Sequence, residues 1–436
     1  MKEVIIIGGG LAGSEAAYQI VKMGGRAIVL EMKPERFSPA HNLPTLSELV
    51  CSNSLKSESL ENAAGVLKEE MRICGSLIIK AAEATRVPAG KTLAVDRKAF
   101  SEFVTEELKG LGVKIITGEV MAIPESRPLI IATGPLTSDA FAEEVQKLVG
   151  HDRLHFYDAV APIVYKDSIN MEKAFMASRY GKGGDDYINC PFTEEEYARF
   201  FEALRDADKV KPRGFEDGLY FERCMPIEVM AERGPKTLLF GPMRPVGLTD
   251  PRTGKRPFAV VQLRREDKEG GLYNIVGFQT RLTFPEQKKV FRLIPGLEAA
   301  EFARLGKLHR NSYIDSPRLL TNAQQLRKDP LILFAGQITG VEGYTESAAS
   351  GMLAGINAFR LASGLLPVCP PPTTLTGALM RYVSDEGKRD FQPMNANMGL
   401  LPEAGAKKDR REAQARRALS DFKVWHDESL ATSRGI

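Results

Sequence analysis

Two of the five cysteines lie in surroundings that suit thiol chemistry. Cys51 lies in a polar Ser/Asn loop directly after the first predicted strand–helix–strand unit, where folds of that kind bring residues near a bound ligand. Cys224 follows Arg223 in a basic part of the chain, and a neighbouring guanidinium favours the thiolate, which is the attacking form. An unreactive thiol is the competing interpretation for both. The chain has no CxxC motif, which disfavours a dithiol–disulfide reductase.

A glycine-rich turn follows the first apolar strand of the chain. Residues 4–7 lead into Gly8, Gly9, Gly10, Leu11, Ala12 and Gly13. In a dinucleotide fold the first glycine permits the turn, the second lets the backbone approach a pyrophosphate, and the third lets the helix pack on the strand. The helix N-terminus then faces the phosphates with its partial positive charge. Enzymes that use S-adenosylmethionine carry a similar glycine loop, so this motif alone leaves both ligands open.

An acidic residue closes the next apolar run. Glu31 follows Gly13 by 18 residues, where a carboxylate would accept both hydroxyls of a ribose and repel a 2′-phosphate. The bound nucleotide is therefore predicted to be FAD or NAD rather than NADP.

Two later segments favour FAD. An apolar strand at 129–131 ends in a turn that contains Thr133 and Gly134. A second glycine cluster follows a strand near the end of the chain and leads into a helix that begins near Glu346; it contains Gly336, Gln337, Gly343 and Tyr344. A helix N-terminus there suits the flavin ring, which carries negative charge when reduced. Both segments look like those of the two-dinucleotide-binding-domain flavoproteins, an α/β fold of the glutathione-reductase-like Rossmann type.

Positive charge is concentrated in two segments. The net charge is only +3, yet residues 205–292 hold 18 Lys/Arg against 12 Asp/Glu, and residues 407–417 hold six against two. Such local surplus suggests a polyanion-binding surface, and a solvated charged face is the alternative. The candidate residues for contacts to a polyanion are Arg223, Arg244, Arg264, Arg265, Lys407 and Arg411.

Length and composition limit the classes of protein to which the chain can belong. A chain of 436 residues with 43% hydrophobic content can bury a core of two or three domains. No apolar run approaches the ~20 residues of a membrane span, and the N-terminus lacks signal-peptide anatomy. An odd, sparse set of cysteines fits a reducing cytoplasm, and five scattered histidines predict no metal site.

The order of predicted elements divides the chain. Asp96 is expected to cap a helix, Thr193 to open another through a capping box, and 67–78 to form one buried helix. Short strands are expected at 238–240 and 259–263. The change of pattern near 166 predicts an inserted, basic α+β substrate domain at 166–300, with an FAD-binding domain made of 1–165 and 301–436.

Nearly end to end, the chain resembles the folate- and FAD-dependent tRNA (uracil-5-)-methyltransferases of bacteria. These are relatives of the glucose-inhibited division protein A flavoproteins that modify tRNA. The residues that carry the resemblance are 8–13, 48–54, 95–97, 131–135, 222–226, 242–248, 276–280, 309–313 and 336–344.

The resemblance implies a reaction. A carbon unit from 5,10-methylenetetrahydrofolate would pass to C5 of a T-loop uridine in tRNA, and FAD reduced by NADH or NADPH would supply electrons. Uracil C5 is a poor nucleophile until a thiolate adds at C6, and a base must later remove the C5 proton. We favour Cys224 as the C6 nucleophile and Cys51 as base or as guard of the flavin; the reverse assignment stays open.

The folate site is expected around His309, Arg310 and Asn311, with His309 stacked on the pterin and Tyr344 able to cover the same face. Two rival functions remain at this level. A small-molecule flavin oxidoreductase would not need the basic insertion. A non-catalytic FAD-binding RNA partner would not need the two cysteines.

Overall fold

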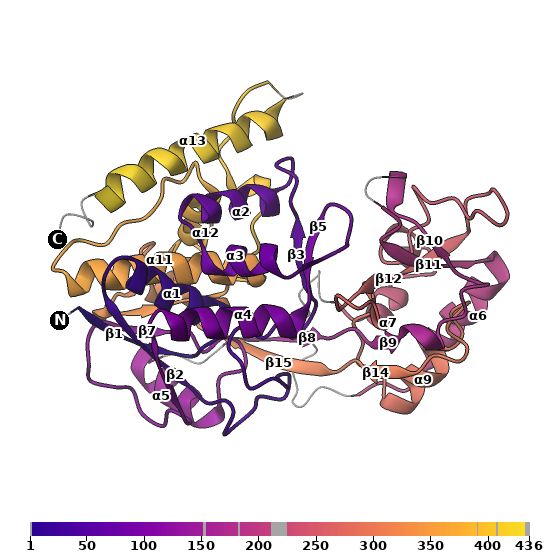
Figure 1. The fold of residues 1–436 in the computed structure, drawn as a ribbon, viewed down its shortest axis with the longest axis horizontal. Coiled ribbons are helices and arrows are strands. Elements are labelled where there is room, and N and C mark those ends of the chain that lie inside the picture. Colours follow the sequence, from indigo (N-terminus) through magenta and orange to yellow (C-terminus); the bar gives the residue numbers. More distant parts are fainter. Residues whose placement is uncertain are drawn as a thin grey trace.

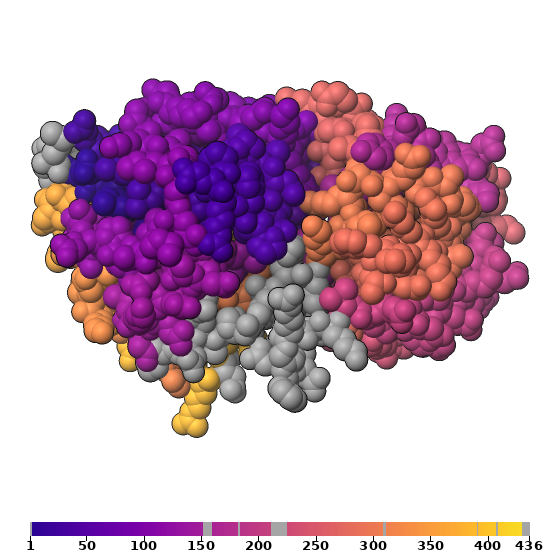
Figure 2. Space-filling view, turned by 90° about the horizontal axis from the view of Figure 1, so that it is seen from below, coloured from indigo at the N-terminus to yellow at the C-terminus, as the bar shows by residue number. Residues whose placement is uncertain are grey.

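The protein is described by a computed structural model that covers residues 2–150, 154–181, 184–210, 225–389, 391–406 and 409–431, with the backbone alone at 154–158, 308–310 and 430–431. Two lobes are seen in Figure 1, and both chain ends lie in the same lobe. In Figure 2 the early residues occupy one end of the molecule and the middle of the chain occupies the other.

A six-stranded sheet forms the centre of the first lobe, in the order β16-β17-β7-β1-β2-β6. All neighbours pair in parallel except β16 and β17. The strands are β1 (Glu3–Ile7), β2 (Arg26–Glu31), β6 (Lys114–Thr117), β7 (Leu129–Ile131), β16 (Gln325–Leu326) and β17 (Asp329–Phe334). Because parallel strands end at one edge, the loops after β1, β2, β7 and β17 meet there, and that edge is where ligands bind in such sheets.

Helices cover both faces of this sheet (Figure 1). On one face α1 and α11 lie against the strands, and on the other the apolar side of α5 packs on Leu129, Ile131 and Phe334. The helices of this lobe are α1 (Leu11–Lys22), α2 (Ala63–Ile73), α3 (Leu77–Ala84), α4 (Arg97–Gly110), α5 (Asp139–Val149), α10 (Ser316–Leu319), α11 (Tyr344–Ala362), α12 (Leu375–Val383) and α13 (Arg410–Ala431).

Small residues let α1 and α11 approach each other closely. A Cβ at Gly351 would collide with the carbonyl oxygen of Ala12, and a Cβ at Gly355 would lie 2.5 Å from that of Ala16. The core of the first lobe therefore continues across the two helices that follow the two glycine clusters.

The second lobe contains an antiparallel sheet in the order β10-β11-β12-β13-β9-β14. Its strands are β9 (Ile163–Tyr165), β10 (Phe175–Met176), β11 (Tyr187–Phe192), β12 (Ala259–Arg265), β13 (Leu272–Ile275) and β14 (Phe302–Arg304). Its helices are α6 (Glu194–Asp206), α7 (Ile227–Glu232), α8 (Thr237–Phe240) and α9 (Phe284–Phe291), which enclose a separate aromatic core.

Two smaller sheets complete the fold. The ribbon of β8 (Leu154–Ala159) and β15 (Leu308–Tyr313) runs between the lobes (Figure 1). The strands β3 (Ser54–Ser57), β4 (Arg86–Val87) and β5 (Thr92–Val95) form a three-stranded sheet next to the Cys51 loop.

The predicted caps are confirmed, and two element predictions are wrong. Asp96 accepts a hydrogen bond from the Ala99 amide at 2.9 Å, and Thr193 forms its capping box with Glu196. The expected strand at 238–240 is instead the helix α8. The expected single helix at 67–78 is two helices, because Gly75 adopts a left-handed φ of 60° and ends α2.

Candidate active site

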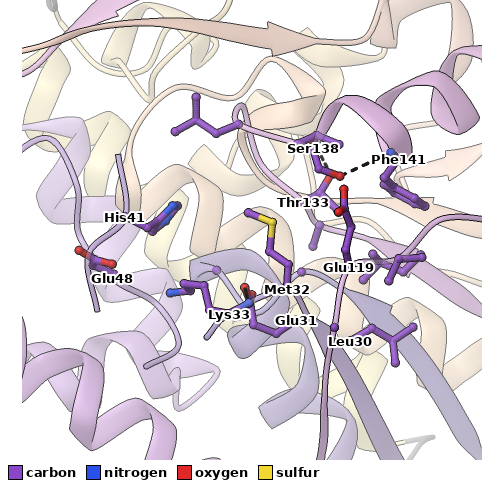
Figure 3. Close-up of a pocket in the computed structure, with 18 residues that line it drawn as sticks. Leu30, Glu31, Met32, Lys33, His41, Glu48, Glu119, Thr133, Ser138 and Phe141 are labelled. Atoms are coloured by element: carbon purple, nitrogen blue, oxygen red, sulfur yellow. Dashed lines mark hydrogen bonds between the residues drawn. The ribbon is translucent and has the colours of Figure 1, made fainter. Parts of the chain in front are cut away.

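A cavity of about 650 Å³ lies at the carboxyl edge of the parallel sheet. Gly8 and Gly10 line it from the loop after β1, Glu31 from the end of β2, and Thr133 from the turn after β7. Figure 3 shows Glu31 and Lys33 along one side of this cavity and Thr133 and Ser138 across from them. The predicted nucleotide-binding residues thus come together from three separate strands. We call this the first cavity.

The glycines of the turn differ in what surrounds them. Gly8 has a φ of 100°, and a Cβ there would lie 2.6 Å from the Ala132 carbonyl oxygen. A Cβ at Gly13 would collide with the carbonyl of Gly8. A Cβ at Gly10, in contrast, would meet no protein atom within 4 Å. Gly8 and Gly13 are therefore required by the protein's own packing, whereas Gly10 keeps open space beside the cavity.

The Glu31 carboxylate is fixed by backbone amides. It accepts hydrogen bonds from the Gly9 amide at 2.7 Å and the Lys33 amide at 3.0 Å, and the side chain is buried. Each carboxylate oxygen can accept more than one hydrogen bond. Glu31 is thus oriented in advance and can still accept hydroxyl groups from a ligand in the first cavity.

A second cavity, of about 1060 Å³, adjoins the first, and Leu136 lines both. Its wall includes Cys51 together with the distal residues Gln337, Gly343 and Tyr344. Asn311, one of the three predicted folate-site residues, also lines this second cavity and is buried. Residues predicted for flavin, folate and thiol chemistry therefore share one space.

The N-terminus of α11 faces this second cavity. The helix begins after Gly343, which has a φ of 119° and provides no side-chain cap. The Thr345 hydroxyl oxygen lines the cavity, is buried, and has no hydrogen-bond partner among the described residues. Uncapped amides and an orphaned hydroxyl at a long helix N-terminus suit a ligand group that carries negative charge. Gln337, nearby, donates to Glu342 at 2.5 Å.

Together the two cavities fit FAD. One offers an open glycine turn and a fixed carboxylate for a nucleotide, and the adjoining one offers a helix N-terminus for the pyrimidine side of a flavin. Gly336 contributes through packing, because a Cβ there would lie 2.8 Å from the Cβ of Ala12 at the start of α1. Thr133 bonds to the Thr137 hydroxyl at 2.6 Å, and Gly134 has a φ of 69°.

The loop that carries Cys51 is anchored by Tyr344. The Tyr344 hydroxyl oxygen accepts hydrogen bonds from the backbone amides of Cys51 and Ser52, at 2.7 and 3.0 Å. Burial raises the pKa of Tyr344 well above its ordinary value. The phenol thus stays protonated and its proton can be donated towards the cavity.

Three arginines hold the same loop from other elements. Arg97 donates to the carbonyls of Leu49 and Val50 and forms a two-pronged ion pair with Glu266, at 2.7 and 3.2 Å. Arg304 donates to the Val50 carbonyl at 3.1 Å, and burial lowers its pKa to about 10. Because Glu266 follows β12 and Arg304 belongs to β14, the loop is fixed by both lobes.

Arg264 is the third of these arginines, and its position corrects an expectation. It was expected on an RNA-binding surface, but it is buried and donates to the Asn53 side chain at 2.9 Å and the Ser52 hydroxyl at 2.8 Å. Burial lowers its pKa below the ordinary arginine value. It lines the second cavity, so RNA could reach it only as a base inserted there.

The other predicted RNA contacts are dispersed. Arg244 is exposed, Arg265 is half-buried at the end of β12, and Arg411 is exposed on α13. On α13, Arg410 pairs with Glu403 and Arg417 donates to the carbonyls of Pro402 and Glu403, so these two charges are directed at the protein itself. Arg223, Cys224 and Lys407 lie outside the described residues, and for His309 and Arg310 only their place in β15 is described.

Sequence reasoning overlooked Arg97, Glu266 and Arg304. Arg97 stands in one of the segments that carry the family resemblance, at 95–97, but nothing local shows that it reaches a carbonyl 48 residues away.

Within the described ranges, no cluster of three or more metal-ligating side chains occurs. None of the helices in those ranges combines the length and apolar character that a membrane crossing requires.

A parallel sheet with a glycine turn, an acidic second strand and a distal helix N-terminus defines the class of dinucleotide-binding α/β proteins. The family model for glucose inhibited division protein A matches residues 3–365. GidA from Aquifex aeolicus, in its form II crystal, superposes with a TM-score of 0.71 at 17% identity, over 99% of this chain and 75% of that one. The predicted fold class is thereby confirmed.

Sequence relatives are much more similar. The methylenetetrahydrofolate–tRNA-(uracil-5-)-methyltransferase TrmFO of Geobacter sulfurreducens is 59% identical over 427 residues, which are 97% of this chain and 98% of that protein. The protein of the same name from Aquifex aeolicus is 56% identical over 443 residues, covering 100% and 99%. The chain therefore belongs to the glucose inhibited division protein A family and, within it, to the methylenetetrahydrofolate–tRNA-(uracil-5-)-methyltransferases.

Proposed function

We propose that this chain is an FAD-dependent enzyme that uses 5,10-methylenetetrahydrofolate to methylate C5 of the T-loop uridine in tRNA. One observation of the structure carries the proposal. The Cys51 side chain lines the second cavity together with Gln337, Gly343 and Tyr344, so a thiol lies in the space assigned to the flavin. The names of relatives that are 55–59% identical support the same reaction.

FAD is assigned to both cavities. Gly8, Gly9, Gly10, Glu31, Thr133 and Gly134 would hold its nucleotide part, with Leu11, Ala12 and Gly13 forming the start of α1 beneath it. Gly336, Gln337, Gly343 and Tyr344 would surround its ring. When bound and reduced, FAD supplies the two electrons that convert the transferred methylene to a methyl group. NADH or NADPH is the proposed source of those electrons.

The thiols divide the chemistry on the uracil. Addition of the Cys224 thiolate to C6 would place negative charge on C5, which would attack the folate methylene carbon as one of the two bonds from that carbon to folate nitrogens breaks. Removal of the C5 proton would then break the second of these bonds and leave an exocyclic methylene group, and reduction of that group to methyl would expel the Cys224 thiolate. Cys51, held by Tyr344 and the arginines, would remove the C5 proton or protect the flavin from side reactions. The reverse assignment of the two cysteines stays open. His309, Arg310 and Asn311 are proposed to contact the folate.

The tRNA is assigned mainly to the second lobe. We propose that 166–300 is an inserted tRNA-binding domain and that 1–165 and 301–436 form the FAD-binding domain. The sheet of the second lobe includes β9 and β14, so the inserted unit would extend a few residues beyond both limits. Phosphate contacts are proposed for Arg223, Arg244, Arg265, Lys407 and Arg411, and the cytoplasm is the proposed compartment, where tRNA is found.

Label transfer tests this function. Purified protein loaded with FAD is incubated with an unmodified tRNA transcript, NADPH or NADH, and methylenetetrahydrofolate that is radiolabelled in its methylene carbon. Label is expected in 5-methyluridine of the T loop. A transcript with cytidine at the target position serves as the matched control and should remain unlabelled. Equal labelling of both transcripts, or of neither, would contradict the proposal.

A further inference from the structure

One exposed aromatic side chain of the second lobe lies in a strained backbone position. Tyr180 is 59% exposed and has φ 59° and ψ 22°, the left-handed region that bulky residues rarely adopt. Its amide donates to the carbonyl of Gly247 at 2.8 Å, which fixes this conformation. Strain of this kind persists where the surroundings determine it, and it is often associated with ligand binding.

The backbone of Gly247 packs against the Tyr180 ring. A Cβ at Gly247 would lie 2.9–3.0 Å from the Cζ, Cε1 and Cε2 atoms of that ring, so the ring rests directly on a glycine backbone. Gly247 itself has a φ of 85°. The Tyr180 ring therefore packs against the Gly247 backbone, while more than half of the residue is exposed to solvent. This arrangement leaves the ring available for stacking on another planar group.

Two arginines belong to the same part of the second lobe: Arg179 precedes Tyr180, and Arg244 is close enough to Arg179 to affect its pKa. Arg179 donates to the Gln262 side chain and the Val246 carbonyl, both at 2.8 Å, which keeps its guanidinium in place. Its pKa is lowered first by burial and then by the positive charge of Arg244, which is exposed nearby. An exposed aromatic ring in a region that also carries positive charge matches the combination that binds single-stranded nucleic acid, in which bases stack and phosphates are neutralised.

The strand β12 connects this place to the second cavity. Gln262, which holds Arg179, and Arg264, which lines the cavity, are two residues apart and point to the same face. Two residues along a strand span about 7 Å. Arg179 is thus connected through β12 to the cavity that contains Cys51, and Tyr180 follows Arg179 outside the set of residues that line it.

We propose that Tyr180, supported by Gly247 and next in the chain to Arg179, stacks on an unpaired nucleobase of the tRNA that lies outside the second cavity. The proposal rests on the function proposed above, because it assumes that tRNA is the substrate.

The test compares Tyr180→Gly, Tyr180→Phe and Tyr165→Ala. Tyr165, 44% exposed on β9, is the matched control for loss of an exposed tyrosine in the same lobe. Tyr180→Gly should weaken tRNA binding about tenfold, while Tyr180→Phe should retain it, because stacking needs only the ring. The KM values for folate and for NADPH should not change. The melting temperature of Tyr180→Gly should not fall, since glycine accepts a left-handed φ.

Three results would overturn the stacking role: unchanged tRNA affinity in Tyr180→Gly, an equal loss in Tyr165→Ala, or a change confined to the KM for NADPH. Binding is measured by filter retention and is independent of turnover. If the wild-type protein bound tRNA without methylating it, the proposed reaction would fail while the stacking comparison still gave an answer. If it methylated tRNA and all variants bound alike, only the stacking role would fail.

Discussion

At the scale of single residues, Gly10 separates cofactor binding from folding. Its neighbours Gly8 and Gly13 contact protein atoms, whereas a Cβ at Gly10 would meet none within 4 Å. We expect Gly10→Val to fold with a normal melting temperature and to purify without bound FAD, because the new side chain would enter the pyrophosphate position. The absorbance of released flavin per protein measures this.

Gly110 supplies the control for that substitution. It ends α4, and a Cβ there also meets nothing within 4 Å. Gly110→Val should retain full FAD content. A Gly10→Val protein that stayed yellow would show that the glycine turn does not hold the pyrophosphate.

Cys51 is the second residue for which a role is proposed. Replacement by alanine should reduce turnover about 10²–10⁴-fold, the usual contribution of a positioned proton-transfer group, and leave FAD content and tRNA affinity unchanged. Single-turnover methylation with the prereduced enzyme measures the rate. Cys369→Ala, at a half-buried thiol away from both cavities, should act like wild type. Methylation by Cys51→Ala at the wild-type rate would remove thiol chemistry from the second cavity.

Local sequence motifs could identify candidate site residues, but they could not show how deeply each side chain is buried or which residues it contacts. Cys51, Tyr344 and Glu31 belong to local patterns, and each lines one of the cavities. Arg264 was assigned to the surface because charge counts do not report burial. Its partners, Ser52 and Asn53, lie more than 200 positions away in the chain. Long-range pairing of this kind is set by how the lobes pack, which no local pattern encodes.

At the scale of elements, periodic and capped segments were predictable. The unit β1–α1–β2 and the caps of α4 and α6 follow from apolar pattern and cap residues. The conformation of 238–240 was not predictable, because three consecutive apolar residues fit a short helix as well as a strand. The division of α2 from α3 depends on one left-handed glycine, which the apolar stripe across 67–78 conceals.

Helix α12 begins on a buried carboxylate from α2. Glu70 accepts hydrogen bonds from the Leu375 and Thr376 amides and from the Thr376 hydroxyl, at 2.7–2.8 Å. Burial raises the pKa of Glu70 to about 7, and these three donors oppose that shift only in part. Because the pKa of Glu70 is higher in the folded protein than in the unfolded chain, protonation of Glu70 stabilises the folded state. This contribution to the free energy of unfolding is complete below about pH 4.5 and is lost as the pH rises through 7.

This linkage predicts a pH-dependent difference in stability. The free energy of unfolding of wild type relative to Glu70→Gln should fall by roughly 3 kcal/mol between pH 4.5 and 7.5, since glutamine does not titrate. Urea denaturation at several pH values measures it. Glu69→Gln, on the same helix but partly exposed and paired with Arg72, should show little such trend. Parallel curves for wild type and Glu70→Gln would mean that Glu70 does not titrate in this range.

At the scale of the whole molecule, the candidate RNA contacts lie on both lobes. Arg244 belongs to the second lobe and Arg411 to α13 of the first. Binding of tRNA across both should depend steeply on salt, because each neutralised phosphate releases counterions. Replacing both arginines by glutamine should weaken binding and reduce the slope of log K against log salt by about 0.7–0.9 per lost contact. FAD content should not change.

Lys147→Gln provides the comparison, because Lys147 is exposed on α5 and pairs with Glu144. That variant should keep the wild-type slope. An affinity for tRNA that does not vary with salt would instead favour a small-molecule flavin oxidoreductase.

The origin of the methyl group is the most direct test of whether this protein transfers the folate methylene to uridine. Methylenetetrahydrofolate with two deuterium atoms on its methylene carbon is supplied with tRNA and NADPH, and the nucleosides are analysed by mass spectrometry. We expect 5-methyluridine in the T loop whose methyl group keeps both deuterium atoms, because the methylene is transferred whole and then reduced. An unlabelled methyl group, a methyl group derived from S-adenosylmethionine, or no 5-methyluridine would contradict it.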